Sequence, residues 1–334
     1  MSLKSIGIIG TGSYVPEKVL TNFDLEKIVD TSDEWIYTKT GIKERRIADE
    51  NEATSDLGTK AALHAIEDAG LDPSDIDLII LATSSPDMMQ PPVACIVQNN
   101  IKAYNSAAFD LGAVCSGFTY ALAIASDIMK GNDNYKNVLV VAAETYSKIL
   151  DWSDRTTCVY FGDGASAVVL SRVKSGFGIL GSYLKADGRG WDVILFPAGG
   201  TRYPATYDTV KNKMHSFKMN GKKVWDFVIE AFPKATIEVL KRCNLTIDNI
   251  DFIISHQANA VLINACLDKL GIPLEKTYLN VHKYGNTSGA SAGIALDEAV
   301  RLNKIKEGDI VIVVGFGGGL TYGSVVMRWG GKER

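Results

Sequence analysis

The chain has 334 residues, of which 46% are hydrophobic and 22% charged, so it can form one large or two ordinary globular domains. Its formal net charge of −4 argues against a nucleic-acid-binding protein, which normally carries a basic patch or stripe. No stretch reaches the roughly 18 uninterrupted apolar residues of a membrane span, and the N-terminus lacks the layout of a signal peptide. We therefore expect a protein of the cytoplasm, away from the membrane.

The cysteines indicate neither a disulfide framework nor a metal site. There are five, an odd number, and they are widely scattered: Cys95, Cys115, Cys158, Cys243 and Cys266. No CxxC and no Cys/His cluster with metal-ligand spacing occurs. This usage is typical of a reducing compartment, and we expect no bound metal.

The first apolar segment contains a G-x-G motif that we do not interpret as a nucleotide-binding turn. It covers residues 6–12, but Val15 stands where the third glycine belongs and Pro16 follows. No helix pattern begins promptly after it, and a G-x-G without its strand–turn–helix setting is a weak signal.

Helices and buried strands then alternate through the first half of the chain. Thr54 or Ser55 can cap a helix that ends at Gly70, and the continuous apolar run 78–82 is typical of a buried parallel strand. The pattern continues with a helix through Ile101, a strand around Phe109, a helix that begins near Cys115, a strand over 138–142, a turn over 161–164 and a strand over 165–170.

The second half repeats this pattern at an offset of roughly 170 residues, which indicates a duplicated domain rather than a solenoid. Residues 249–254 echo 75–80, and residues 310–314 echo 138–142. Alternating strands and helices make each half α/β, with the most apolar helices between two sheets. We predict domains 1–174 and 175–334, the first carrying the candidate nucleophile and the second its polar partners.

Cys115 begins the helix pattern after a short apolar strand that ends in glycine. A thiol in the first helical turn feels the positive end of the macrodipole, which favours thiolate and nucleophilic reactivity. The alternative is a buried structural cysteine, because free cysteine is among the most buried residue types.

Three further features fall at repeat-related places. Asn286 occupies nearly the same turn in the second half as Cys115 does in the first, and His256 follows the strand 252–254. The glycine cluster 315–319 follows the last long apolar run and could offer backbone N–H groups as an oxyanion hole. A lone histidine or a glycine cluster is more often structural, but their shared placement predicts one central thiol site.

Four motifs make the chain resemble 3-oxoacyl-[acyl-carrier-protein] synthase III, a thiolase-like condensing enzyme that starts fatty-acid chains. They are Val114-Cys-Ser-Gly-Phe118, Ser255-His-Gln-Ala-Asn259, Tyr284-Gly-Asn-Thr-Ser288 and Gly317-Gly-Gly-Leu-Thr-Tyr-Gly323. The resemblance covers almost the whole chain. It implies a five-layer αβαβα fold of two duplicated halves and a homodimer.

The resemblance also implies the role of each site residue. Cys115 takes the acyl group from acyl-CoA, while His256 and Asn286 stabilise the enolate formed when malonyl-acyl carrier protein loses CO2. Backbone N–H groups of Cys115 and Gly318 form the oxyanion hole. The product is a 3-oxoacyl carrier protein, and no cofactor is implied beyond the CoA thioesters that serve as substrates.

The same resemblance places a CoA site and an acyl pocket. The CoA-binding residues would be Thr31, Trp35, Lys39, Arg155, Gly221 and Asn259, and the acyl pocket would contain Gln90. A flat indole and a guanidinium, from Trp35 and Arg155, can sandwich an adenine. Lys39 stands where many relatives have arginine and so loses bidentate phosphate contact, and Gln90 replaces a phenylalanine.

The expected carrier-docking surface departs from the family pattern. Three positions that are basic in the best-known relative are Asp226, Val261 and Asp268 here. This keeps open a sibling enzyme of specialised metabolism that does not use the standard malonyl carrier protein. A papain-like cysteine hydrolase also has Cys, His and Asn in this order, but its local cysteine signature and disulfides are missing.

Overall fold

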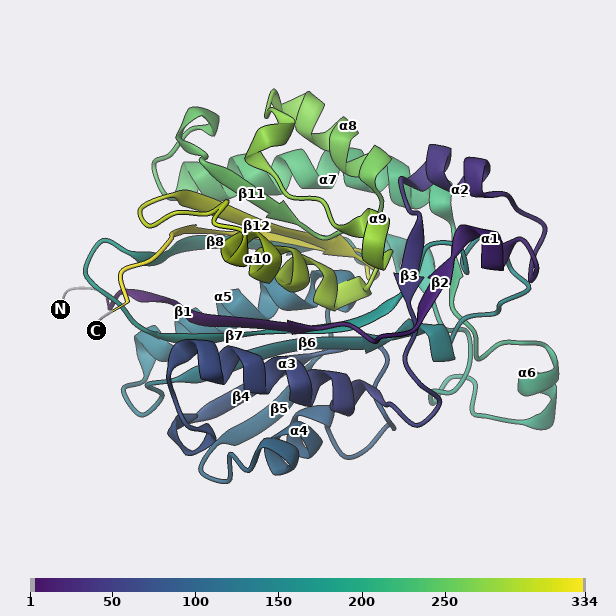
Figure 1. Cartoon of the computed structure of the whole chain (residues 1–334), viewed down its shortest axis with the longest axis horizontal. Helices are drawn as coiled ribbons and strands as arrows, with labels where there is room; N and C mark the ends of the chain where they lie inside the picture. Colours follow the sequence, from purple (N-terminus) through teal and green to yellow (C-terminus); the bar gives the residue numbers. More distant parts are fainter. Residues whose placement is uncertain (1–3, 333–334) are drawn as a thin grey trace.

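A computed structural model describes residues 4–332 and contains two large β-sheets (Figure 1). The first sheet has five strands in the order β1-β7-β6-β4-β5. β4 pairs in parallel with β5 and β6, whereas β7 is antiparallel to β6 and β1. Its strands are β1 (Ile6–Tyr14), β4 (Leu78–Ala82), β5 (Ala107–Leu111), β6 (Val138–Thr145) and β7 (Asp163–Arg172).

The second sheet repeats this order with one strand fewer. It runs β8-β13-β12-β11, and a single parallel bridge from Ile253 to Thr277 stands where the first sheet has β5. Its strands are β8 (Gly178–Ala186), β11 (Phe252–Ser255), β12 (Ile310–Gly317) and β13 (Thr321–Arg328). The duplication predicted from the offset of the apolar runs is confirmed. The predicted boundary between residues 174 and 175 stays a prediction; it falls in the segment between β7 and β8.

Three helix layers enclose the two sheets, as Figure 1 shows. α3 (Thr54–Ala69) and α4 (Val93–Ile101) cover the outer face of the first sheet, and α7 (Gly221–Arg242) and α8 (Ala260–Leu270) cover that of the second. α5 (Gly117–Gly131) and α10 (Ser291–Arg301) lie between the sheets. This arrangement confirms the five-layer αβαβα fold.

The central strands are apolar at successive positions because both of their faces are buried. In β4, Leu78 and Ile80 face the core between the sheets, whereas Ile79 and Leu81 face α3 and α4. In β12, Val311 faces the middle of the molecule and the next residues alternate in the same way. Continuous apolar runs are the expected pattern for strands buried on both sides.

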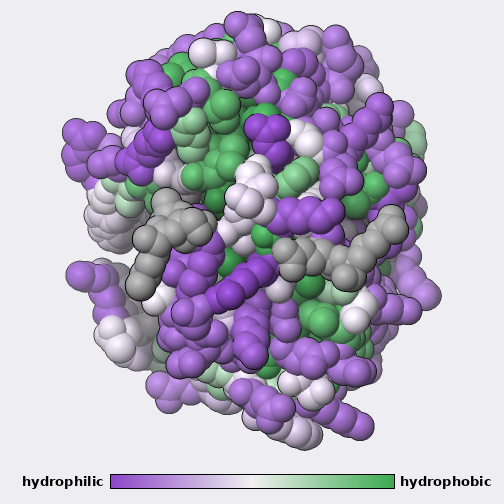
Figure 2. Space-filling model, turned by 90° about the vertical axis from the view of Figure 1, so that its left-hand side faces the viewer, coloured by the Kyte–Doolittle hydropathy of each residue, from purple (hydrophilic) through white to green (hydrophobic). Residues whose placement is uncertain are grey.

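Smaller elements gather at one end of the molecule, to the right in Figure 1. They are two two-stranded antiparallel sheets and four short helices: β2 (Val19–Thr21) with β3 (Glu44–Arg46), β9 (Ile194–Leu195) with β10 (Lys218–Met219), α1 (Asn22–Leu25), α2 (Asp33–Thr40), α6 (Tyr207–Lys211) and α9 (Val281–Tyr284). The face at the left-hand side of Figure 1 is covered mainly by hydrophilic side chains, with smaller hydrophobic areas between them (Figure 2). Within residues 4–332 there is no helix with the length and apolar character to cross a membrane.

Three local predictions were wrong. The cap of α3 is Ala53, whose N–H is held by the Asp56 carboxylate at 2.8 Å. Thr54 instead donates to the Ser85 carbonyl oxygen. The predicted turn 161–164 already belongs in part to β7, and the glycine cluster 315–319 lies largely inside β12, because ladder pairing continues through both segments.

The rejected G-x-G motif has a packing role. A Cβ atom added to Gly12 would lie 2.4 Å from the Ala65 backbone nitrogen, and one added to Gly10 would lie 2.4 Å from the Ala65 carbonyl oxygen. Only glycine therefore lets α3 approach β1 this closely.

We predict that Gly12→Ala lowers the free energy of unfolding by about 1–3 kcal/mol, because the added methyl group overpacks against rigid helix backbone. Urea denaturation would measure the loss. Gly131→Ala is the matched control, since nothing lies within 4 Å of the added Cβ and this helix position is exposed. A loss at Gly12 no larger than that of the control would contradict the packing role.

Candidate active site

The site is built from two turns of the same backbone shape. Val114 and Ser288 both have φ of 47°, and each begins a three-residue 3₁₀ turn that leads directly into a helix between the sheets. Left-handed conformations are uncommon for non-glycine residues and persist where the surroundings impose them. By this match Gly289, rather than Asn286, is the repeat equivalent of Cys115.

A cavity of about 460 Å³ brings the three predicted catalytic residues together. Cys115, His256 and Asn286 all line it. Most of the other residues that line the cavity are apolar or aromatic. The full set is Trp35, Thr38, Lys39, Tyr160, Phe161, Ile194, Phe217, Met219, Gly221, Val224, Trp225, Ala258, Asn259, Val261, Leu262, Phe316 and Gly317. Such a wall suits an acyl chain or pantetheine arm with a few polar anchor points.

Cys115 lies at the inner end of the cavity and is only 8% exposed. Burial raises the pKa of its thiol to about 12, and the Ser288 hydroxyl together with the backbone N–H groups of Cys115 and Gly318 oppose this rise. The thiolate predicted from the helix dipole is therefore not the resting state. The oxyanion hole that was expected from the same two N–H groups stays a prediction.

β12 can reach this turn because Gly317 has no side chain. A Cβ atom on Gly317 would lie 2.6 Å from the Cβ of Cys115. Any larger residue would push the strand from the turn and carry the Gly318 N–H away from the sulfur. The glycine cluster thus acts through close approach as well as through its N–H groups.

His256 is held as a neutral imidazole. It is 2% exposed, and burial lowers its pKa to about 3. Its Nδ1 lies 2.6 Å from Ser291 Oγ, which also accepts the Gln257 N–H at 3.0 Å, and its ring packs edge-on against Phe316 with centroids 5.0 Å apart. The ring is thereby fixed, with Nε2 as the nitrogen left for a ligand.

Asn286 is oriented by its own turn. Its Oδ1 accepts the Ser288 N–H at 2.8 Å, so the amide group of the side chain remains as a donor. Its backbone pairs with the first half of the chain, donating to the Tyr160 carbonyl at 2.8 Å and accepting from Gly162 N–H at 3.1 Å. This cross-half pairing ties the two duplicated units together at the site.

Four of the six predicted CoA residues line the cavity: Trp35, Lys39, Gly221 and Asn259. Arg155 lies over the Trp35 ring, with its guanidinium carbon 5.4 Å from the centroid. An adenine between them needs about 7 Å, two contact distances, so the pair must open to form the predicted sandwich. Thr31 lies outside the cavity, and its buried hydroxyl has no hydrogen-bond partner among residues 4–332.

Gln90 is not brought to this cavity. It lies on the surface beside Met89, Pro91, Pro92 and Asp110. Its place in an acyl pocket therefore stays a prediction that the single chain does not reproduce. Within residues 4–332, no group of three or more His, Cys, Asp or Glu side chains could hold a metal ion.

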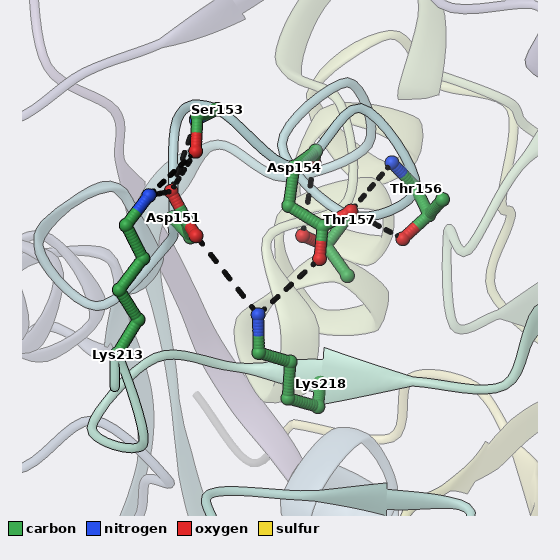
Figure 3. Close-up of polar contacts among 7 residues, drawn as sticks. All are labelled: Asp151, Ser153, Asp154, Thr156, Thr157, Lys213 and Lys218. Carbon is green, nitrogen blue, oxygen red and sulfur yellow. Dashed lines mark hydrogen bonds and ion pairs between the residues drawn. The ribbon is translucent and has the colours of Figure 1, made fainter. Parts of the chain in front are cut away.

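An ion-pair network fixes the wall beside Arg155 (Figure 3). Lys213 lies 3.0 Å from Asp151, and Lys218 lies 3.4 Å from Asp154 and 4.0 Å from Asp151. The Ser153 hydroxyl, and then Lys213, lower the pKa of Asp151 to about 2 against the effect of burial. These contacts hold the segment that contains β10, which brings Phe217 and Met219 to the cavity, against the loop that carries Arg155.

Comparison with known proteins identifies the family. Residues 109–188 match the model described as 3-oxoacyl-[acyl-carrier-protein] synthase III, and residues 240–329 match the model of its C-terminal part. The chain is 58% identical over 323 residues to the beta-ketoacyl-[acyl-carrier-protein] synthase III of Caldanaerobacter subterraneus subsp. tengcongensis, covering 97% of both chains. The chain belongs to the 3-oxoacyl-[acyl-carrier-protein] synthase III family.

Two further relatives carry the same family name, and the family predicted from the four motifs is confirmed. The enzyme of the same name from Clostridioides difficile is 52% identical over 97% of this chain and 98% of its own length. The crystal structure of 3-oxoacyl-[acyl-carrier-protein] synthase III from Aquifex aeolicus has a TM-score of 0.89 and 45% identity, covering 97% of this chain and all of that one.

Two buried residues near Cys115, Ser288 and Glu144, have no role in the sequence analysis of this synthase. Ser288 Oγ lies 3.4 Å from Cys115 Sγ, and Glu144, which is fully buried, acts on the thiol through its charge. The sequence contained a signal that Glu144 is unusual. It follows directly after the apolar run 138–143, so its carboxylate has to be buried with that strand, and a buried carboxylate is rare unless it has partners.

We predict that His256 makes the protein sensitive to acid. Unfolded histidine titrates near pH 6.5 but the folded imidazole only near pH 3, so the unfolded state binds more protons as the pH falls below 6.5. Between pH 7 and pH 5 this costs about 2 kcal/mol of stability, which His256→Asn should abolish. Urea denaturation at both pH values measures the difference, with the exposed His64→Asn as control; equal acid loss in wild type and His256→Asn would contradict it.

Proposed function

We propose that this enzyme starts acyl chains by condensing an acyl group from acyl-CoA with malonyl-acyl carrier protein, giving 3-oxoacyl-acyl carrier protein and CO2. The observation that carries this proposal is the meeting of Cys115, His256 and Asn286 in one mainly apolar cavity. The names of the relatives support the same reaction. The reaction needs no resident cofactor, because thioester chemistry requires only a nucleophile and placed hydrogen-bond donors.

In the first half-reaction the sulfur of Cys115 attacks the acyl-CoA carbonyl. The backbone N–H groups of Cys115 and Gly318, which lower the pKa of the buried thiol, would hold the oxyanion that forms on the substrate carbonyl oxygen. The C–S bond to CoA then breaks, and the acyl group stays on Cys115 as a thioester. Each preorganised donor of this kind contributes roughly 3–4 kcal/mol to transition-state stabilisation.

In the second half-reaction the malonyl group loses CO2, and its enolate attacks the acyl-Cys115 carbonyl. The Nδ2–H of Asn286 and Nε2–H of His256 donate to the enolate oxygen. A proton on Nε2 requires Nδ1 to accept a hydrogen bond, so the Ser291 hydroxyl has to turn its proton from the Ser288 carbonyl oxygen, at 2.9 Å, to Nδ1, at 2.6 Å. A neutral imidazole suits this role, since it donates without first losing a proton.

The arm of CoA would enter past Gly221 and Asn259, with the base near Trp35, Arg155 and Thr31 and the phosphates near Lys39. This assignment is supported by the four of these residues that line the cavity. The unpartnered Thr31 hydroxyl offers the adenosine end a hydrogen bond. The free cysteines and the CoA substrates favour the cytoplasm as the compartment.

The active form would be a homodimer joined through β5. This strand is the edge of the first sheet, and its Phe109 is 37% exposed. Exposed apolar side chains on a sheet edge invite pairing with another strand, and Met88 and Met89 add exposed apolar surface on the neighbouring loop. A second copy seated here would carry Gln90 toward its partner's acyl pocket.

A cysteine hydrolase fits the geometry less well. A papain-type mechanism needs a histidine in contact with the thiol, but Nδ1 of His256 is bound to Ser291 and burial lowers its pKa to about 3. A relative of specialised metabolism keeps the same chemistry and differs in carrier docking; of the three positions concerned, Asp226, Val261 and Asp268 are all exposed, and Val261 also lines the cavity.

We predict that His256→Ala and Asn286→Ala retain acylation of Cys115 but lose malonyl decarboxylation by about 100-fold or more, because they donate to the enolate rather than to the sulfur. Intact mass after incubation with acyl-CoA measures acylation, and CO2 release measures decarboxylation. Peptide mapping should place the acyl group on Cys115. An acyl group on Cys158, or loss of acylation with decarboxylation intact, would reverse these roles.

We also predict weak and weakly salt-dependent use of malonyl carrier protein. Carrier proteins are acidic and are steered by basic side chains, an effect that falls with salt. Of the lysines near the mouth, Lys269 is paired with Glu230 at 2.5 Å, whereas Lys222 and Lys223 are exposed and make no ion pair among residues 4–332. Turnover with malonyl carrier protein and with malonyl-CoA, compared across a salt series, gives the test.

A strong carrier preference that collapses with salt would show that Lys222 and Lys223 dock the carrier. The matched comparison is Lys222→Ala/Lys223→Ala against Lys241→Ala/Lys304→Ala, an exposed pair on the same fold. If carrier docking is weak, neither double variant changes the ratio of the two turnover rates by more than about twofold.

A further inference from the structure

The short loop between β12 and β13 packs against the turn that carries Cys115. Ladder pairing ends at Gly317 and Thr321, and the three residues between them form the loop. A Cβ atom added to Gly317 would lie 3.0 Å from the Cys115 backbone nitrogen. Gly318 is the next residue along the chain, so a small shift of the loop changes the position of its N–H relative to the nucleophile.

The side chain of Thr321 joins this loop to the Cys115 turn. Its Oγ1 lies 2.9 Å from the Gly318 carbonyl oxygen, within the loop, and 3.2 Å from the Ala113 carbonyl oxygen, just before the turn. It also lies 2.5 Å from Oγ of Ser116, the last residue of the turn. Ser116 Oγ itself lies 2.9 Å from the Ala113 carbonyl oxygen. One threonine hydroxyl group therefore contacts the chain both before and after the nucleophile.

These contacts act as one unit, because two hydroxyl protons serve all of them. Each hydroxyl group can donate once, and the contact between Thr321 and Ser116 uses one of the two protons. The other proton goes to a carbonyl oxygen, that of Gly318 or that of Ala113. In either pattern the bond between the two hydroxyl groups ties the base of the loop to the turn, and loss of either group removes it.

The two ends of the loop are held in different ways. Leu320 exchanges two backbone hydrogen bonds with Asp187, at 3.1 and 2.8 Å, which fix the end that leads into β13. The end at Gly318 is held by the hydroxyl group of Thr321, whose partner Ser116 is 0% exposed. A buried and satisfied polar network of this kind rigidifies the groups that it connects.

We propose that Thr321, with Ser116 as its partner, is a positioning residue for acyl transfer, because it holds the Gly318 N–H in register with the Cys115 turn. Among residues 4–332, the set that lines the cavity includes neither Thr321 nor Ser116, so both act through the loop rather than on the substrate. The inference rests on the proposed function, since it assigns what holds an oxyanion donor of that reaction. A misplacement of about 1 Å in such a donor can slow a reaction by about 100-fold.

Single-turnover acylation tests the proposal, with the Cys115 adduct measured by intact mass. The probe is whichever of acetyl-, butyryl- and hexanoyl-CoA gives the most adduct in wild type. Thr321→Val keeps the branched shape without the hydroxyl group, and Thr321→Ser keeps the hydroxyl group. We expect Thr321→Val to slow acylation at saturation by about tenfold or more, with the half-saturating concentration within about twofold, because the donor acts on the transition state. Thr321→Ser should stay within about twofold of wild type, since it retains the tie.

Alkylation by iodoacetamide separates the oxyanion donor from the thiol itself. In this reaction the Cys115 sulfur displaces iodide from a saturated carbon and the thiol proton passes to solvent, so no oxyanion forms. We expect Thr321→Val to change the alkylation rate of Cys115 by less than about threefold, because only acyl transfer uses the oxyanion donor. Peptide mapping distinguishes Cys115 from the other four cysteines.

A double-variant cycle tests whether the two hydroxyl groups act as a unit. Ser116→Ala should also slow acylation, and Ser116→Ala/Thr321→Val should be no more than about twofold slower than Thr321→Val, because the same bond is lost in each. Two independent defects would instead multiply. Ser324→Ala is the matched control, since it removes from β13 a buried hydroxyl group that donates to the Ala235 carbonyl oxygen at 2.7 Å, and it should acylate at the wild-type rate.

The proposal is refuted if Thr321→Val acylates at the wild-type rate, or if Thr321→Ser is as slow as Thr321→Val. It is equally refuted if acylation and alkylation slow by the same factor, because that result indicates a general structural role. Absence of any acyl adduct on Cys115 in the wild-type protein, with alkylation intact, would instead overturn the proposed function. Should Thr321→Val fail to fold, Ser116→Ala decides the matter through the same two rates.

Discussion

The close contact between β12 and the Cys115 turn is the constraint on which the site depends. The two sheets hold their helices between them, and the turns that begin α5 and α10 must fit in the same buried layer. Gly317 allows β12 to reach the Cys115 turn, and Gly315 allows it to reach Ser116, where an added Cβ would lie 2.9 Å from the Cα. Without these contacts, the Gly318 N–H would not reach the sulfur.

The same burial decides the protonation of the site. Water exclusion favours the neutral forms of Cys115 and His256 and so works against the effect of the helix N-terminus on the thiol. A site of this kind gains strong hydrogen bonds to developing charge, but it has to move protons through the protein. Ser288 contacts the thiol, and Ser291 fixes the orientation of the His256 ring.

The fold, and the meeting of Cys115, His256 and Asn286 in one cavity, could be predicted because both depend on local pattern. Buried strands such as β4 are apolar at every position, and the offset between two such runs shows the duplication without any knowledge of contacts. Cys115 and His256 stand out by their places at strand ends, whereas Asn286 lies three residues before Gly289, the true repeat equivalent of Cys115. Other features depend on distances that no local pattern contains, such as the cap of α3 or the narrow gap between Trp35 and Arg155.

Surface features were predictable only in part. Gln90 was expected in an acyl pocket, but the single chain places it on the surface, away from the cavity of Cys115. Glu144 received no role, since its importance comes from the hydroxyl groups that surround it in space and not from its neighbours in sequence. Composition gives the sign of the net charge but does not show that Lys269 is already paired.

The repeat also explains why only one half carries a nucleophile. Gly289 occupies the place of Cys115 in the second turn, and a Cβ there would lie 3.1 Å from the Val114 carbonyl oxygen and 3.2 Å from the Glu144 carboxylate. A side chain at this position would crowd the first turn and bring its bulk against the buried charge. Its N–H instead donates to Glu144. The second turn therefore supports the first: one copy of the duplicated unit presents the thiol, and the other holds the carboxylate and the amide beside it.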